Sequence, residues 1–167
     1  MTEILTSTIE SPIGPLTLVA RDGLLTNVSM HEQRHMAPPP EGAVTDDAWF
    51  KDVAQQLDAY FAGELSSFDL EMDLIGTTFQ RNVWAALGEI PYGETISYGE
   101  LAQCVGNPNA SRAVGLANGR NPIALIVPCH RVIGANGSLT GYGGGLERKT
   151  WLLEHELRHR DAFVAVR

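Results

Sequence analysis

A cysteine and a histidine stand side by side in the run IVPCHRVIG, residues 126–134. A thiolate is a strong nucleophile, and a neighbouring imidazole that takes the thiol proton raises the thiolate fraction at neutral pH. Cys129 and His130 are therefore a candidate nucleophile and base. Neighbouring side chains on a strand point to opposite sides, so the pair can cooperate only if the chain turns at Pro128. A buried structural thiol explains the same residues, and the pair alone leaves both interpretations open.

Cys104 is the second cysteine of the chain. It lies among apolar neighbours in a predicted helix, and we expect an inert, packed thiol. Two cysteines are too few for a disulfide framework or a four-thiolate zinc site, and a reducing compartment would keep both as thiols.

The second half of the chain predicts helices that position this pair. Two helix starts carry capping boxes, in which a hydroxyl and a Glu or Gln three residues later satisfy each other's backbone amides. These are Thr77 with Gln80 and Ser97 with Glu100. Asn107 followed by Pro108 predicts a third helix that begins there and runs to about Asn118. Two helices joined by a short glycine-containing turn across residues 97–119 form the helix-turn-helix pattern, which occurs in DNA-binding domains and in other helical domains.

The third predicted helix has a face of mostly small residues. They recur at i, i+4, i+7 and i+8, and they are Ser111, Gly115, Asn118 and Gly119. Such a face can approach a DNA backbone or groove closely without reading the base sequence, for which long side chains are needed. Arg112 beside it is the one long donor. Tight packing on another helix explains the small residues equally well.

The first half predicts a small α/β unit. Three alternating runs predict antiparallel strands, namely ILTSTI, LTLVA and LLTNVSM, with turns at residues 11–14 and at Asp22-Gly23. Residues 31–47 contain three successive prolines and no period, which predicts an exposed loop. Helical spacing from Trp49 to Phe61 predicts a helix that Gly63 ends. We place the domain boundary at Gly76.

Charge is distributed unevenly between the two halves. Residues 1–76 hold three basic and thirteen acidic residues, a net charge of −10, whereas residues 77–167 hold nine and seven, a net charge of +2. The asymmetry predicts two domains with different partners, even though the total of −8 argues at first against nucleic acid. The sequence contains no membrane-length apolar run and no secretory signal pattern, so we expect a cytoplasmic protein with no membrane partner.

Five blocks of the second half, taken in order and with their spacing, resemble the O6-alkylguanine-DNA alkyltransferase family. They are TFQRNVWAAL, ISYGELA, GNPNASRAVGLANGRNP, PCHRV and GYGGGLERKTWLLEHE. The resemblance implies a small ribonuclease-H-like α/β domain over residues 1–76, a helical, winged-helix-like (helix-turn-helix) domain over residues 77–160, and a C-terminal tail from 161 to 167. It also implies direct, irreversible repair of alkylated guanine in a single turnover.

The resemblance assigns catalytic roles by position. Cys129 corresponds to the alkyl acceptor, and His130 to the histidine that passes its proton through a bound water. Glu156 corresponds to the carboxylate that orients the imidazole; it lies four residues after Leu152, which suits a partly buried partner. Asn121 corresponds to the hinge asparagine between recognition helix and active-site segment.

DNA contacts follow in the same way, because the family acts on a base flipped out of the duplex. Tyr98 corresponds to the tyrosine that meets guanine N3 and crowds the turned phosphate, and Arg112 to the arginine that replaces the lost base in the stack. The carbonyls of Cys129 and Val132 would accept from the exocyclic amine, and Tyr142 and the Gly143 amide would line the O6 side. Many relatives carry serine at the position of Gly143.

The implied partner is double-stranded DNA that contains O6-alkylguanine, bound through its minor groove by a protein that is monomeric in solution and can be cooperative on DNA. From three cations, Arg112, Arg120 and Arg131, we expect phosphate contacts. No cofactor is expected, and no zinc, because the first half contains no cysteine.

Two other functions fit parts of the sequence. A non-catalytic relative that only flags damaged bases would lack the thiol at position 129, so Cys129 argues against it. A cysteine hydrolase with a Cys-His-Glu triad would need a substrate groove and an oxyanion element, for which the sequence gives no sign.

Overall fold

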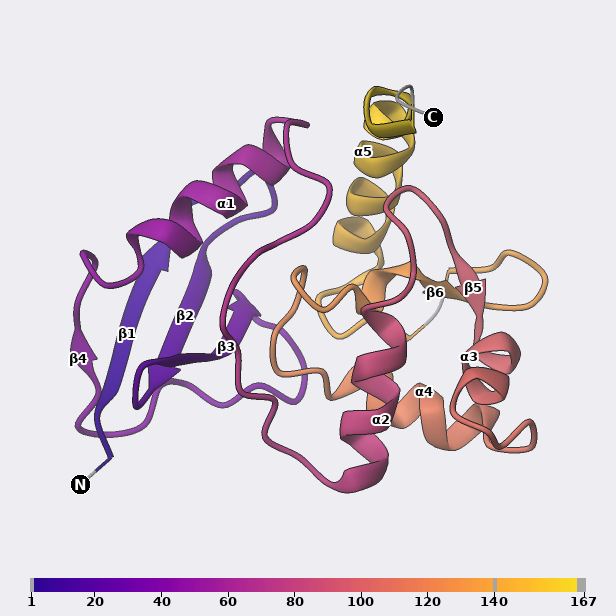
Figure 1. The fold of residues 1–167 in the computed structure, drawn as a ribbon, viewed down its shortest axis with the longest axis horizontal. Helices are drawn as coiled ribbons and strands as arrows, with labels where there is room; N and C mark the ends of the chain where they lie inside the picture. The colour runs from indigo at the N-terminus through magenta and orange to yellow at the C-terminus, as the bar shows by residue number, and fades with distance from the viewer. Residues whose placement is uncertain (1, 140, 165–167) are drawn as a thin grey trace.

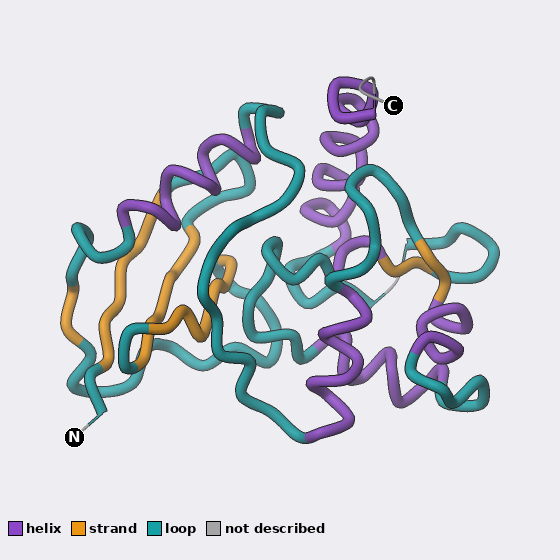
Figure 2. Tube along the Cα trace, viewed as in Figure 1, coloured by secondary structure: helices purple, strands orange, loops and turns teal. Residues whose placement is uncertain are grey.

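The computed structural model describes residues 2–139 and 141–164, which form an N-terminal sheet domain and a C-terminal helical domain (Figure 1). The strands of the first domain and the helices of the second occupy opposite sides of the molecule, with a long connecting segment between them (Figure 2). This two-domain arrangement confirms the coarse division predicted from the sequence.

The N-terminal sheet has the strand order β3-β2-β1-β4. Its strands are β1 (Ile4–Ile9), β2 (Leu16–Arg21), β3 (Leu24–Met30) and β4 (Val44–Thr45). The first three pair antiparallel as predicted, and the turn residues Asp22 and Gly23 both have positive φ, which the two-residue type I′ hairpin requires. The expectation of a loop throughout residues 31–47 was wrong at its end, because β4 pairs parallel to β1.

Helix α1 (Lys51–Phe61) covers one face of this sheet (Figure 1). Val53, Leu57 and Tyr60 form its buried side. Trp49 precedes the helix, and Gly63 follows it with φ +78°, the left-handed conformation that favours glycine after a helix.

The C-terminal domain contains α2 (Thr78–Leu87), α3 (Tyr98–Cys104), α4 (Ser111–Gly119) and α5 (Leu146–Val164). Both predicted capping boxes are present, at Thr77 and at Ser97. The predicted start of the third helix was wrong. Asn107 instead folds its own turn, because its side chain accepts from the Asn109 amide at 3.3 Å and its carbonyl accepts from the Ala110 amide at 3.0 Å. The helix begins only after that turn, at Ser111.

Two short strands, β5 (Ile96–Ser97) and β6 (Val132–Ile133), pair in parallel and fix the start of α3 beside the segment that carries Cys129. A second connection joins the domains, since the Val28 amide donates to the Pro122 carbonyl and the Ala124 amide donates to the Val28 carbonyl, both at 3.0 Å. Strand β3 thus continues its hydrogen bonding into the C-terminal domain. Among the residues that the structure describes, no helix is long and apolar enough to cross a bilayer.

Candidate functional site

A tight turn presents the Cys129–His130 pair. After Pro128 the chain forms the short 3-10 helix η1 (Cys129–Arg131), which supplies the turn that cooperation between the two side chains requires. Cys129 is 6% exposed and His130 is fully buried. Burial raises the pKa of the Cys129 thiol, whereas the Asn121 side chain and the Lys149 charge act in the opposite direction. The resting thiol therefore keeps its proton at neutral pH, and a base must remove it before sulfur can attack.

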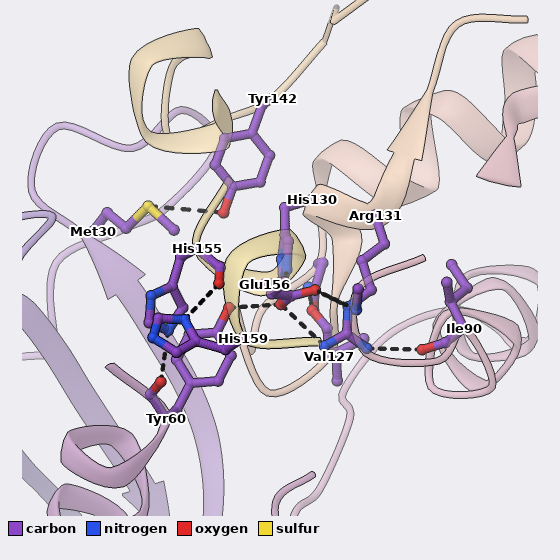
Figure 3. Close-up of polar contacts among 12 residues, drawn as sticks. Met30, Tyr60, Ile90, Val127, His130, Arg131, Tyr142, His155, Glu156 and His159 are labelled. Carbon is purple, nitrogen blue, oxygen red and sulfur yellow. Dashed lines mark hydrogen bonds and ion pairs between the residues drawn. The ribbon is translucent and has the colours of Figure 1, made fainter. Parts of the chain in front are cut away.

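Glu156 lies on α5, in contact with His130, and is 1% exposed (Figure 3). Its Oε2 accepts from His130 Nε2 at 2.7 Å, from the Tyr60 hydroxyl at 2.6 Å and from Arg131 Nη2 at 3.0 Å. Its Oε1 accepts from Arg131 Nε at 2.7 Å and from the Gly93 amide at 3.3 Å. Tyr60, His130, Arg131 and Glu156 are called the Glu156 cluster below.

The carboxylate of this cluster stays ionised. Burial alone would raise the pKa of Glu156, but its interactions with His130 and Arg131 outweigh that effect and hold the pKa well below its ordinary range. An ionised carboxylate only accepts, so His130 carries its proton on Nε2. The other ring nitrogen, Nδ1, is buried and has no hydrogen-bond partner among the described residues. Nδ1 is therefore the ring nitrogen that no described residue occupies.

Arg131 does not face solvent, so the expectation that it contacts DNA phosphates was wrong. It is buried, and besides Glu156 its guanidinium donates to the Ile90 carbonyl at 2.7 Å (Figure 3). The guanidinium also lies over the Tyr92 ring. Its charge is used inside the protein, because a buried carboxylate needs a partner.

Two asparagines hold the backbone of the active-site segment. Asn121 is buried; its Oδ1 accepts from the Ile123 amide at 3.0 Å and its Nδ2 donates to the Val127 carbonyl at 2.7 Å. Between these contacts Leu125 adopts φ +72°, a strained conformation for a branched residue. Asn118, predicted on the small outer face of α4, is instead buried and donates to the Cys129 carbonyl at 3.3 Å.

Lys149 is a functional candidate that sequence reasoning missed. It is fully buried on α5 and donates to the Val132 carbonyl at 2.6 Å. Desolvation lowers the pKa of Lys149 to about 8, while the nearby Cys129 acts in the opposite direction. The only signal in the sequence was its place inside the block GYGGGLERKTWLLEHE. Lys149 and Asn118 together show that both carbonyls predicted to meet a guanine already have a protein donor.

The outer side of the site is formed by α4 and the loop before α5. Ser111 and Arg112 are exposed, Gly115 and Gly119 are partly exposed, and Leu116 is 67% exposed. These five residues are called the α4 face below. The Tyr98 ring lies over Gly115, where an added Cβ would be 3.6 Å from it, and its hydroxyl lies near Gly141.

The N-terminal domain grips the loop that carries Tyr142 and Gly143. The Arg34 amide donates to the Gly143 carbonyl at 2.9 Å, and the buried Tyr142 hydroxyl lies 3.9 Å from the Met30 sulfur (Figure 3). A side chain at Gly144 would collide with Met30. A cavity of about 240 Å³ opens between this loop and the α4 face. Its lining residues are Arg34, His35, Gly115, Leu116, Gly119, Arg120, Gly141, Tyr142 and Gly143.

Cys104 was wrongly expected to be packed. It is exposed as the last residue of α3. The prediction failed because the helix ends at Cys104, so the side chain lies at the end of the helix rather than in its middle.

Comparison with known proteins extends over both domains. Residues 78–158 match the family described as "6-O-methylguanine DNA methyltransferase, DNA binding domain", and residues 4–74 match its "ribonuclease-like domain". Methylated-DNA–protein-cysteine methyltransferases of Mycolicibacterium paratuberculosis and Methanosarcina acetivorans are 59% and 56% identical to this chain. The alignments cover 95% and 88% of it, and 96% and 94% of those proteins. The crystal structure of Mycobacterium tuberculosis OGT in complex with DNA is 59% identical with a TM-score of 0.86, and the match covers 91% of this chain and 92% of that one.

Proposed function

The chain belongs to the 6-O-methylguanine DNA methyltransferase family, and we propose that Cys129 is the residue that accepts the alkyl group. The activity is direct-reversal DNA repair, in which the alkyl group of a damaged base is transferred to a cysteine of the protein. One observation supports Cys129 most strongly. It is buried next to His130, whose Nε2 donates a hydrogen bond to the ionised carboxylate of Glu156. Cys104, by contrast, is exposed at the end of α3.

The proposed step balances as a displacement at saturated carbon. The Cys129 thiol gives its proton through a bound water to His130 Nδ1, and the sulfur attacks the alkyl carbon on guanine O6. The new bond is carbon–sulfur and the broken bond is carbon–oxygen, whose electron pair leaves with the guanine. A proton returns to the departing base. Glu156 stabilises the transient imidazolium and fixes the ring orientation.

The α4 face is the proposed docking surface for duplex DNA, in the minor groove. Its small residues Ser111, Gly115 and Gly119 permit close approach, and Arg112 enters the stack where the damaged base has left it. Tyr98 crowds the rotated phosphate and meets guanine N3. Asn118 is not part of this surface; its buried contact with the Cys129 carbonyl supports a role in holding the active-site backbone.

The flipped guanine enters the cavity beside Tyr142. The Tyr142 ring and the Gly143 amide line the O6 side, and the carbonyls of Cys129 and Val132 accept from the exocyclic amine with their second lone pairs. Asn121 keeps the connecting segment in its strained shape during this approach.

The proposed domains are a ribonuclease-H-like unit over residues 1–76 and a winged-helix-like unit over residues 77–160, with a tail from 161 that begins inside α5. The acidic first domain faces away from the duplex. The protein acts as a monomer that can bind DNA cooperatively, and it works in the cytoplasm, where reducing conditions keep Cys129 a thiol.

Mass spectrometry of the protein after incubation with a duplex that contains O6-methylguanine tests the assignment. We expect one added methyl group on the peptide that contains Cys129. Cys129→Ser should abolish transfer but still bind the modified duplex, since an alcohol with a far higher pKa is a poor nucleophile toward alkyl carbon. Absence of label would indicate a protein that only senses damage. Label on another residue would overturn the role of Cys129.

A further inference from the structure

Tyr60 brings a hydroxyl group from the N-terminal domain into the Glu156 cluster (Figure 3). It lies on α1, ninety-six residues before Glu156, and is fully buried. Its hydroxyl donates to Glu156 Oε2 at 2.6 Å, and the same oxygen accepts from His130 Nε2 at 2.7 Å. One oxygen therefore joins the N-terminal domain to the proposed base.

Packing alone does not require this hydroxyl. The Tyr60 ring has aromatic neighbours whose ring centroids lie 5.3–6.2 Å away, namely Phe61, Phe68, Tyr92 and His155. A phenylalanine would fill the same volume. The hydroxyl instead supplies a donor to a buried charge, and hydrogen bonds to charged groups are among the stronger ones in proteins.

The hydroxyl remains a donor under all ordinary conditions. The pKa of Tyr60 is raised well above 10, mainly by burial and secondly by the negative charge of Glu156. Tyr60 therefore cannot serve as a base, and its contribution is limited to orienting and stabilising the carboxylate.

The positions of the donors explain why one more matters. Arg131 donates to both Glu156 oxygens, at 2.7 and 3.0 Å, and so holds the carboxylate from one side. Tyr60 approaches Oε2 from the other domain, so that this oxygen is held where His130 Nε2 can reach it. A carboxylate held on two sides keeps the imidazole in a single orientation with Nδ1 free.

We propose that Tyr60 is a positioning residue for alkyl transfer: it fixes the Glu156 carboxylate and, through it, the His130 ring that accepts the Cys129 proton. The proposal rests on the assignment of Cys129 and His130 given above. It also gives the N-terminal domain a part in the reaction.

The test compares Tyr60→Phe with Tyr92→Phe in single-turnover experiments at saturating O6-methylguanine duplex. Tyr92 is a matched control, because its hydroxyl is buried close by but has no hydrogen-bond partner among the described residues. Tyr60→Phe should lower the rate constant of methyl transfer about tenfold, as expected when a hydrogen bond to a charged group is lost. The Kd for the duplex should stay within about twofold of the unmodified protein. Tyr92→Phe should change neither quantity.

A loss of affinity without a loss of rate would overturn the proposal, and so would equal losses in both variants or an unchanged rate in Tyr60→Phe. If the unmodified protein transfers no methyl group to Cys129, the proposed function itself fails, and the two failures are thereby distinguished.

A double-mutant cycle tests whether Tyr60 acts through Glu156. In a Glu156→Gln background the Tyr60→Phe change should alter the transfer rate by less than about twofold, because the charge that the hydroxyl serves is gone. The same tenfold factor in both backgrounds would mean that Tyr60 acts elsewhere. The comparison with Tyr92→Phe stands without this cycle if Glu156→Gln does not fold.

Discussion

The two sides of Cys129 are built in opposite ways. Behind it, the Glu156 cluster is buried, and its carboxylate accepts five hydrogen bonds. In front, the α4 face presents small residues, an exposed leucine and an exposed arginine beside an open cavity. The buried, hydrogen-bonded Glu156 cluster suits proton transfer. The small, exposed residues of the α4 face suit the close approach of DNA. Changes behind Cys129 should therefore affect rate and stability, and changes in front should affect binding.

Arg131→Met should have the largest effect on the side behind Cys129. It leaves the Glu156 charge buried without its arginine partner, which typically costs about 3–5 kcal/mol of unfolding free energy. The transfer rate should fall at least about tenfold with little change in duplex affinity. Denaturant unfolding and single-turnover kinetics measure both quantities.

Arg158→Met is the matched control, because Arg158 is exposed on the same helix as Glu156. It should change stability by no more than about 0.5 kcal/mol. Similar stability losses in the two variants would remove the distinction between the buried cluster and an ordinary surface charge.

Arg112→Ala tests the α4 face. The variant should lose about tenfold or more in repair of duplex DNA, because no side chain then fills the gap left by the flipped base. Repair of a free base or of a single strand should change less than about twofold, and stability should be unaffected, since Arg112 is exposed. Equal losses on duplex and free-base substrates would contradict the intercalating role.

The salt dependence of DNA binding has the smallest expected effect among the tests of the α4 face. With Arg131 buried, two exposed cations remain of the three expected from the sequence, Arg112 and Arg120. The slope of log Kd against log salt concentration should then have a magnitude of no more than about 2, because roughly 0.9 is expected per phosphate contact and Arg112 enters the base stack. A magnitude beyond about 6 would show that DNA docks on another surface.

Local signals predicted much of the molecule correctly. The hairpin at Asp22-Gly23 and the capping boxes at Thr77 and Ser97 are encoded within four residues, so the sequence is enough to place them. Errors arose where a competing local interaction was equally short-range, as at Asn107, whose side chain forms a turn instead of capping a helix.

Long-range pairing is what the sequence could not show. The sequence pattern predicts that Tyr60 is one more core residue of α1 and that Arg131 is a cation next to the reactive pair. Their shared partner, Glu156, lies ninety-six residues from the first and twenty-five from the second. Lys149 was missed for the same reason, since a lysine in a helix is ordinarily a solvated charge.

Titration of the protein against an excess of duplex containing O6-methylguanine, with peptide mapping of the product, tests the central assignment most directly. The thioether formed on Cys129 has no good leaving group, so the methyl group should stay on the sulfur. We expect methyl transfer to stop at one per chain, with all label on the peptide that contains Cys129. Several turnovers per chain, or label on Cys104, would contradict it.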